Sequence, residues 1–141
     1  MRAKDFFLAV REAERAVKGL RAKLRKYQEM AASIGGMSET NIRTIGNRSR
    51  TENAALRLVE TEDQLGDAGE QYVALIEKAE RVLAQIKTRR YVDVLTYRYI
   101  CCMSWRSVAD EMGYKDEKSV FRVHGWALAA AQRALDKMAD V

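Results

Sequence analysis

The sequence contains no proline, one histidine and two cysteines, and these shortages limit the folds, metal sites and disulfides that the chain can form. Proline is the strongest helix breaker, so its absence beside abundant Ala, Leu, Glu, Lys and Arg predicts an almost wholly helical, all-α protein. The single His124 cannot build a metal cluster or a histidine-based catalytic site. Cys101 and Cys102 are adjacent, which is not a zinc-site spacing and disfavours a disulfide between them. We therefore expect no metal, no cofactor and reduced thiols.

Long apolar runs and catalytic pairings are lacking as well. The apolar segments are too short to span a membrane, and the N-terminus has no long apolar stretch of the signal-peptide kind. These features predict a cytoplasmic protein that does not contact the membrane. No paired carboxylates, nucleophile–base pair or phosphate-binding loop appears at a usable spacing, so an enzyme is the least expected class.

Positive charge is in excess, with a formal net charge of +5 at pH 7. Such an excess favours an acidic partner, for which nucleic acid is the usual candidate. The excess is concentrated at the start, where residues 1–29 hold nine Lys or Arg against four Asp or Glu, whereas residues 88–141 hold nine against seven. The basic N-terminal helix either follows a DNA backbone or forms the solvated face of a coiled coil, and the solvated face is favoured.

The first 87 residues have the spacing of two long helices, predicted over 4–30 and 50–87. A narrow apolar seam of this kind needs a partner helix, which predicts an antiparallel hairpin or an intermolecular coiled coil. Ser49 and Glu52 form a capping-box pattern at the start of the second helix. The first seam contains Phe6, Val10, Ala13, Val17, Leu20, Leu24 and Tyr27, and the second contains Ala55, Leu58, Leu65, Tyr72, Ile76, Ala79, Leu83 and Ile86.

Residues 31–48 break both helical patterns and are expected to connect the two helices. Arg43, Arg48 and Arg50 lie close together in the sequence, at the end of this segment and just after it. The segment is interpreted as a mobile surface loop with a short helical turn near Ser38 to Ile42, the alternative being an additional phosphate-binding arm.

The segment 89–135 has the pattern of a helix-turn-helix. The spacing predicts helices over 91–100, 105–112 and 117–138, with Ser104 capping the helix over 105–112. Gly113 ends that helix and Asp116 caps the next, which leaves a turn of three to four residues. A turn this short is typical of motifs that place their second helix in the major groove of DNA.

The helix over 117–138 has one apolar stripe and an opposite polar side. The stripe, which we expect in the core, contains Val120, Val123, Ala127, Leu128, Ala131, Ala134, Leu135 and Met138. The opposite side supplies the candidate DNA-binding residues Lys118, Ser119, Arg122 and Gly125, with Lys115 and Arg106 as neighbours.

Two features weigh against these candidates. Basic residues on a helix are more often ordinary solvated charges, and Asp116 and Glu117 would repel phosphate at the start of the helix. His124 is expected to be a partly buried structural residue, the alternative being a contact to phosphate or base.

The stretch TYRYICCMSWRSVADEMGY resembles region 4 of bacterial sigma factors. SWRSVADEMGY followed by VFRVHGWAL is similar to a family of bacteriophage and prophage proteins, and ASIGGMSETNIRTIGNRSRTENAALRLVE extends this resemblance over nearly the whole chain. The family lies beside phage late-transcription regulators of the ArpU and RinA type, so the resemblance implies a regulator in the cytoplasm of a bacterial host cell. Phe121 replaces the tyrosine that is usual in the family. The matching positions are Ser104, Trp105, Val108, Ala109, Gly113, Tyr114, Phe121, Arg122, His124, Gly125, Ala127 and Leu128.

Together these patterns predict a helical arm over 1–87 and a DNA-binding domain over 88–141. The leading hypothesis is a phage or prophage transcription regulator that reads double-stranded DNA and uses its arm to form a homo-oligomer or to reach host RNA polymerase. One alternative is a DNA-packaging component of the small-terminase kind, which ring formation would favour. The other is a helical adaptor that binds a protein surface and not DNA.

Overall fold

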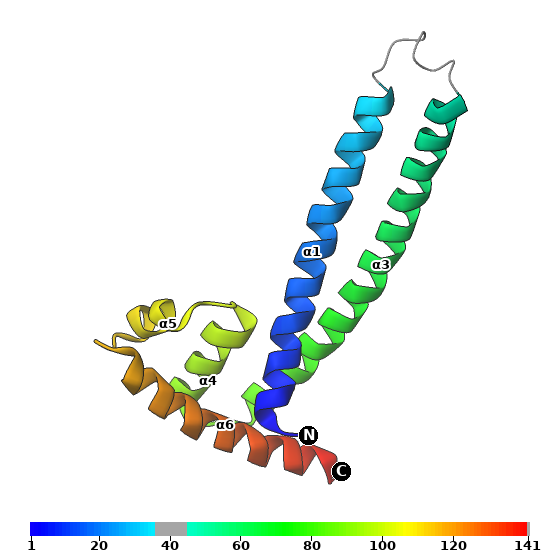
Figure 1. Ribbon diagram of the computed structural model, residues 1–141. Coiled ribbons are helices and arrows are strands. Elements are labelled where there is room, and N and C mark those ends of the chain that lie inside the picture. The colour runs from blue at the N-terminus through cyan, green and yellow to red at the C-terminus, as the bar shows by residue number, and fades with distance from the viewer. Residues whose placement is uncertain (36–44, 141) are drawn as a thin grey trace. The chain divides into compact units, whose positions relative to one another are not determined.

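The computed structural model describes residues 1–35 and 45–140, and within this range the regular structure is entirely helical, with no strand. The prediction of an all-α chain is confirmed for these residues. Trp105–Met112 agrees with its predicted bounds, and the last helix ends one residue later than predicted. The elements are α1 (Ala3–Gly35), α3 (Ile45–Ala84), α4 (Arg89–Leu95), the π-helical segment η1 (Thr96–Ile100), α5 (Trp105–Met112) and α6 (Glu117–Ala139) (Figure 1).

Two compact units divide the chain, and they differ from the expected division at Lys87. One unit joins Met1–Glu14 to the chain from Tyr72 onward, and the other comprises Arg15–Gln71. Both long helices therefore contribute to both units. The physical reason is that Phe6 and Phe7, near the start of α1, belong to the same buried apolar cluster as the C-terminal helices.

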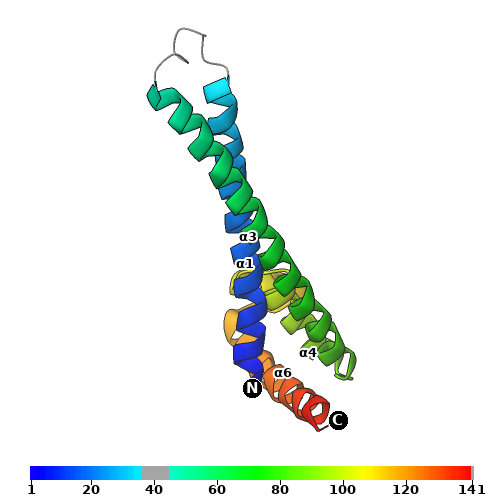
Figure 2. The same ribbon diagram turned by 90° about the vertical axis from the view of Figure 1, so that its right-hand side faces the viewer.

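The unit that contains the C-terminal helices has one continuous apolar core. The main-chain N–H of Ala3 donates a 2.7 Å hydrogen bond to Gln132 Oε1, which ties the start of α1 to α6. The helix α4 lies beside α6 in both views (Figure 1, Figure 2). The predicted α6 stripe is confirmed, because all eight of its members are buried or partly buried within this core. The largest fully buried side chains are Phe6, Phe7, Val10, Val82, Val94, Leu95, Val108 and Val120.

In the unit Arg15–Gln71, all of the predicted seam residues except Ala55 are buried or partly buried. Val17 is 5% exposed and Thr61 3% exposed, and these are its most buried residues. The prediction for Ala55 is wrong, because this residue is exposed and the inward face passes through Leu58, Thr61 and Leu65. A straight α-helix drifts about 20° per heptad, so a strict seven-residue repeat does not stay on one face.

The segment predicted to connect the long helices is helical at both of its ends. Because α1 continues to Gly35 and α3 begins at Ile45, the predicted helix start at Ser49 is wrong, and the boundaries of the 31–48 loop are wrong as well. A local capping signal is a weak preference that the surrounding helix can override. The expected turn near Ser38 to Ile42, together with Arg43, lies outside the described residues.

The last turn of the helix predicted over 91–100 is widened into the π-helical segment η1. The N–H of Cys101 donates to the carbonyl of Thr96 at 2.9 Å, five residues earlier, and the N–H of Met103 donates to the carbonyl of Tyr97 at 2.9 Å. Cys102 then adopts a left-handed conformation with φ 56°, which costs a non-glycine residue roughly 1–2 kcal/mol. Such widened turns often mark functional regions of a helix.

Candidate functional site

Four residues connect α5 to α6, and their geometry agrees with the sequence prediction. Gly113 takes the left-handed conformation, with φ 77° and ψ 21°, and ends α5. The next N–H, from Tyr114, donates to the carbonyl of Ala109 at 2.9 Å. Asp116 is extended, with φ −137° and ψ 164°, and caps α6. The short connection therefore contains one helix-ending glycine and one capping carboxylate, as predicted.

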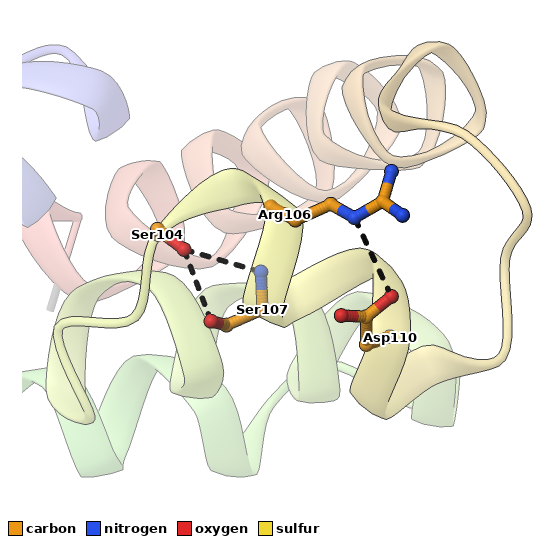
Figure 3. A network of polar contacts seen from close by, with 4 residues as sticks. All are labelled: Ser104, Arg106, Ser107 and Asp110. Atoms are coloured by element: carbon orange, nitrogen blue, oxygen red, sulfur yellow. Dashed lines mark hydrogen bonds and ion pairs between the residues drawn. The ribbon is translucent and has the colours of Figure 1, made fainter.

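The start of α5 is also capped as predicted. Ser104 Oγ accepts a 3.2 Å hydrogen bond from the Ser107 N–H and donates to Ser107 Oγ at 3.0 Å (Figure 3). Arg106, a candidate DNA contact, points away from this cap and forms a 3.7 Å ion pair with Asp110 on the same helix. The two side chains are 69% and 66% exposed, so the pair is weak and leaves the guanidinium accessible.

The other candidates gather at the start of α6 and in the connection before it. Lys118, Arg122 and Gly125 are exposed on the side of α6 opposite its buried stripe, and Lys115 is exposed in the connection. No atom from elsewhere in the described chain lies within 4 Å of the position a Gly125 Cβ would take. This surface therefore has room for another molecule to approach the backbone closely.

Ser119 differs from the other candidates because the helix cap engages it. Its N–H and its hydroxyl both donate to Asp116 Oδ1 at 3.1 Å. The backbone hydrogen bond from Ser119 is the main reason that the pKa of Asp116 is lowered, and the hydroxyl, Lys118 and Arg122 lower it further. Asp116 is thus a carboxylate at neutral pH, and its negative charge lies beside the two basic candidates.

His124 lies on the partly buried side of α6. Its Nε2 shares a 2.6 Å hydrogen bond with the hydroxyl of Tyr99. Burial lowers the pKa of His124 to about 4, and the positive charges of Lys4 and Arg98 add to the effect. The imidazole is therefore neutral at pH 7. The prediction of a partly buried, structural histidine is confirmed.

An aromatic layer supports α5 against α6. The Trp105 ring meets His124 edge-on at 4.7 Å between centroids and meets Phe121 at 5.1 Å. The Arg98 guanidinium lies 4.2 Å from the centre of the Trp105 ring and donates through Nη1 to the Met103 carbonyl at 2.9 Å. These contacts connect the widened turn to both helices of the candidate site, so they hold the exposed surface of α6 in place.

Sequence reasoning did not identify the exposed aromatic side chains on α6. Phe121 is 45% exposed and Trp126 is 46% exposed. The Arg90 guanidinium, from α4, lies 5.6 Å from the centre of the Trp126 ring. Helical spacing could have predicted that both rings are exposed, because positions 121 and 126 fall outside the apolar stripe. It could not have predicted that Arg90 lies over the Trp126 ring, because Arg90 belongs to another helix.

Comparisons with protein families, curated proteins and solved structures gave no match for this chain. Within residues 1–35 and 45–140, no helix joins the length and the apolar character that crossing a membrane demands. In the same part of the chain, no three His, Cys, Asp or Glu side chains come together as a metal site requires.

Proposed function

We propose that this protein binds double-stranded DNA through the N-terminal half of α6 and acts as a phage or prophage transcription regulator. The observation that carries the proposal is the short, glycine-ended connection before a helix whose exposed side presents Lys118 and Arg122. This arrangement is what a helix-turn-helix needs in order to insert its second helix into the major groove. The resemblance to sigma-factor region 4 supports the same assignment.

Each basic residue has a distinct proposed role. Arg122 lies one turn further into α6 than Lys118 and, in the proposed complex, hydrogen-bonds the edge of a base. Lys118, at the first turn, contacts a backbone phosphate. Gly125 allows the backbone of α6 to lie close to the duplex. Lys115 and Arg106 add phosphate contacts, and Ser119 offers only the acceptor capacity that its bond to Asp116 leaves.

Titration of labelled phage or prophage DNA fragments at two salt concentrations tests the proposal. We expect Arg122→Ala to weaken the free energy of DNA binding by about 1–3 kcal/mol and to relax the sequence preference at one base pair. We expect Lys118→Ala to weaken all sequences alike and to lower the salt slope by about one. Arg81→Ala, which removes an exposed cation from α3, is the matched control. Unchanged binding by the Lys118→Ala, Arg122→Ala double variant would refute the proposal.

A second candidate function, a protein-binding adaptor, is favoured by the exposed aromatic residues. Trp and Arg are the residue types that most often dominate the energy of protein interfaces, and Trp126 with Arg90 is such a pair. Under this alternative, Trp126→Ala abolishes capture of a protein partner such as host RNA polymerase, while Arg122→Ala leaves capture intact. The DNA titration decides between the two, because only the first function depends on Lys118 and Arg122.

Self-association through Arg15–Gln71 is part of the proposal. Residues 15–26 of α1 carry six basic residues and no acidic one, whereas residues 58–71 of α3 carry five acidic residues and no basic one. Leu56 and Val59 are 60% and 56% exposed on α3. A second copy related by two-fold symmetry would place opposite charges together around this apolar strip. Light scattering measures the mass of the assembly in solution. We expect a dimer, and we expect Leu56→Glu to dissociate it into monomers. A ring of several copies would instead favour a DNA-packaging role.

A further inference from the structure

A basic cleft lies beside the middle and last turns of α6, away from the residues proposed to read bases. Its volume is ≈ 250 Å³, and the segment 85–91 forms its other wall. Lys87, Arg133 and Lys137 line it together with the hydroxyl-bearing Thr88 and Tyr91, and no carboxylate does. The cleft therefore presents three cationic side chains around one space.

The charges of the cleft are not neutralised within the described chain. Neither Lys87, Arg133 nor Lys137 forms an ion pair with a residue in 1–35 or 45–140. Two nearby carboxylates have other partners: Asp136 Oδ1 accepts a 3.0 Å hydrogen bond from Gln132, and Asp93 pairs with Arg89 at 3.2 Å. Asp140, three residues after Lys137, is exposed and forms no ion pair with the cations of the cleft. A cleft with hydrogen-bond donors and unpaired positive charge is suited to an anion.

The cleft continues the basic side of α6. At 3.6 residues per turn, Lys118, Arg122, Arg133 and Lys137 fall within an arc of about 100° on the exposed side of the helix. Asp136 and Asp140, near the last turn, fall in the same arc. With a rise of about 1.5 Å per residue, Lys118 and Lys137 are separated by roughly 28 Å along the axis. Arg90, over the Trp126 ring, lies between the two ends of this row. A ligand that spans the row is long and repeatedly anionic, as a nucleic-acid duplex is.

We propose that this cleft binds a backbone phosphate of the same DNA duplex, through Lys87, Arg133 and Lys137. The inference rests on the proposed function and extends it, because it assigns a second contact that positions the duplex and carries no sequence information. Arg122 would then select the site, and the cleft would fix the direction of α6 along the groove.

Equilibrium titrations from 50 to 200 mM salt, with a preferred duplex and one of unrelated sequence, test the inference. Arg133→Gln and Lys137→Gln should each lower the slope of log K against log salt by about 0.9 and weaken both duplexes alike, by about eightfold at 0.1 M salt. In each variant, the ratio of the affinities for the two duplexes should stay at its parental value. Arg81→Gln removes the same charge from an exposed site outside the cleft and should keep the parental slope.

The outcomes separate the two proposals. A parental salt slope in the folded Lys87→Gln, Arg133→Gln, Lys137→Gln triple variant would overturn the cleft inference alone, provided that the parent binds DNA. A parent that binds neither duplex at 50 mM salt would overturn the proposed function and the cleft inference with it. A changed preference between duplexes would also overturn the inference, because a phosphate contact cannot distinguish sequences. Thermal melting establishes that each variant is folded, and the single variants decide the question should the triple variant unfold.

Discussion

The hydroxyl of Tyr99 and Nε2 of His124 lie 2.6 Å apart, and their hydrogen bond joins the π-helical segment to α6. Tyr99 is 2% exposed, and burial raises the pKa of its hydroxyl. His124 stands next to Gly125 and two residues after Arg122, so this bond anchors the part of α6 that presents the candidate site. The widened turn at Thr96–Ile100 is thereby connected to the surface proposed to meet DNA.

Replacing His124 should flatten the dependence of stability on pH. The pKa of His124 is about 4 in the folded protein and 6.5 in an unfolded chain, so between these values the unfolded state binds more protons. Its contribution is present above pH 6.5 and is lost as the pH falls towards 4. With partial exposure of the ring taken into account, we expect the parent to lose about 1 kcal/mol more than His124→Gln between pH 7 and pH 5. Urea unfolding at both pH values measures this, and parallel profiles would contradict it.

Two glycine substitutions should change stability in opposite directions. Gly113→Ala forces a side chain into the left-handed conformation, with φ 77°, and should destabilise the protein by about 1–2 kcal/mol. Gly125→Ala adds a methyl group to open space in the interior of α6 and should stabilise it by about 0.5–1 kcal/mol. Urea midpoints of the two variants and the parent give the order. A stabilising Gly113→Ala would mean that the connection does not have this geometry.

A carboxylate at Val17 should be far more damaging than one at the neighbouring position. Val17 is 5% exposed, whereas Ala16 is exposed. Burying an unpaired carboxylate costs several kcal/mol, so we expect Val17→Asp to lose about 3 kcal/mol or more and Ala16→Asp to change stability by about 0.5 kcal/mol or less. Denaturation followed by circular dichroism compares the two. Equal midpoints would show that the seam between α1 and α3 is open to water.

The parts of the fold that sequence predicted best are those governed by contacts within a few residues. Ser104, Gly113 and Asp116 act on backbone groups three to five residues away, so their spacing defined α5 and the start of α6 closely. Apolar periodicity likewise identified the α6 stripe. The capping pattern at Ser49 failed because the same residue types can also sit inside a helix, and nothing local distinguishes the two cases.

The features that sequence did not predict depend on residues far apart in the chain. Thr61 is polar, so no apolar pattern includes it, yet it is 3% exposed where α1 meets α3. Lys87 and Arg133 line one cleft only because the chain before α4 lies against α6. The pairing of Arg90 with Trp126 has the same origin. Spacing along a single helix cannot supply such relationships.

Neutralising Asp116 should strengthen DNA binding without altering the fold. Its Oδ1 accepts hydrogen bonds from the N–H and the hydroxyl of Ser119, which lower the pKa of a carboxyl group that is already ionised at neutral pH. Asparagine retains a capping oxygen, so Asp116→Asn should melt like the parent. Loss of a charge that repels phosphate should raise the affinity for every duplex by about three- to tenfold at 0.1 M salt. Glu80→Gln, an equal charge change on the exposed side of α3, should leave binding unchanged. If Asp116→Asn binds with parental affinity, the duplex does not approach the start of α6, and the adaptor function becomes the better explanation of this surface.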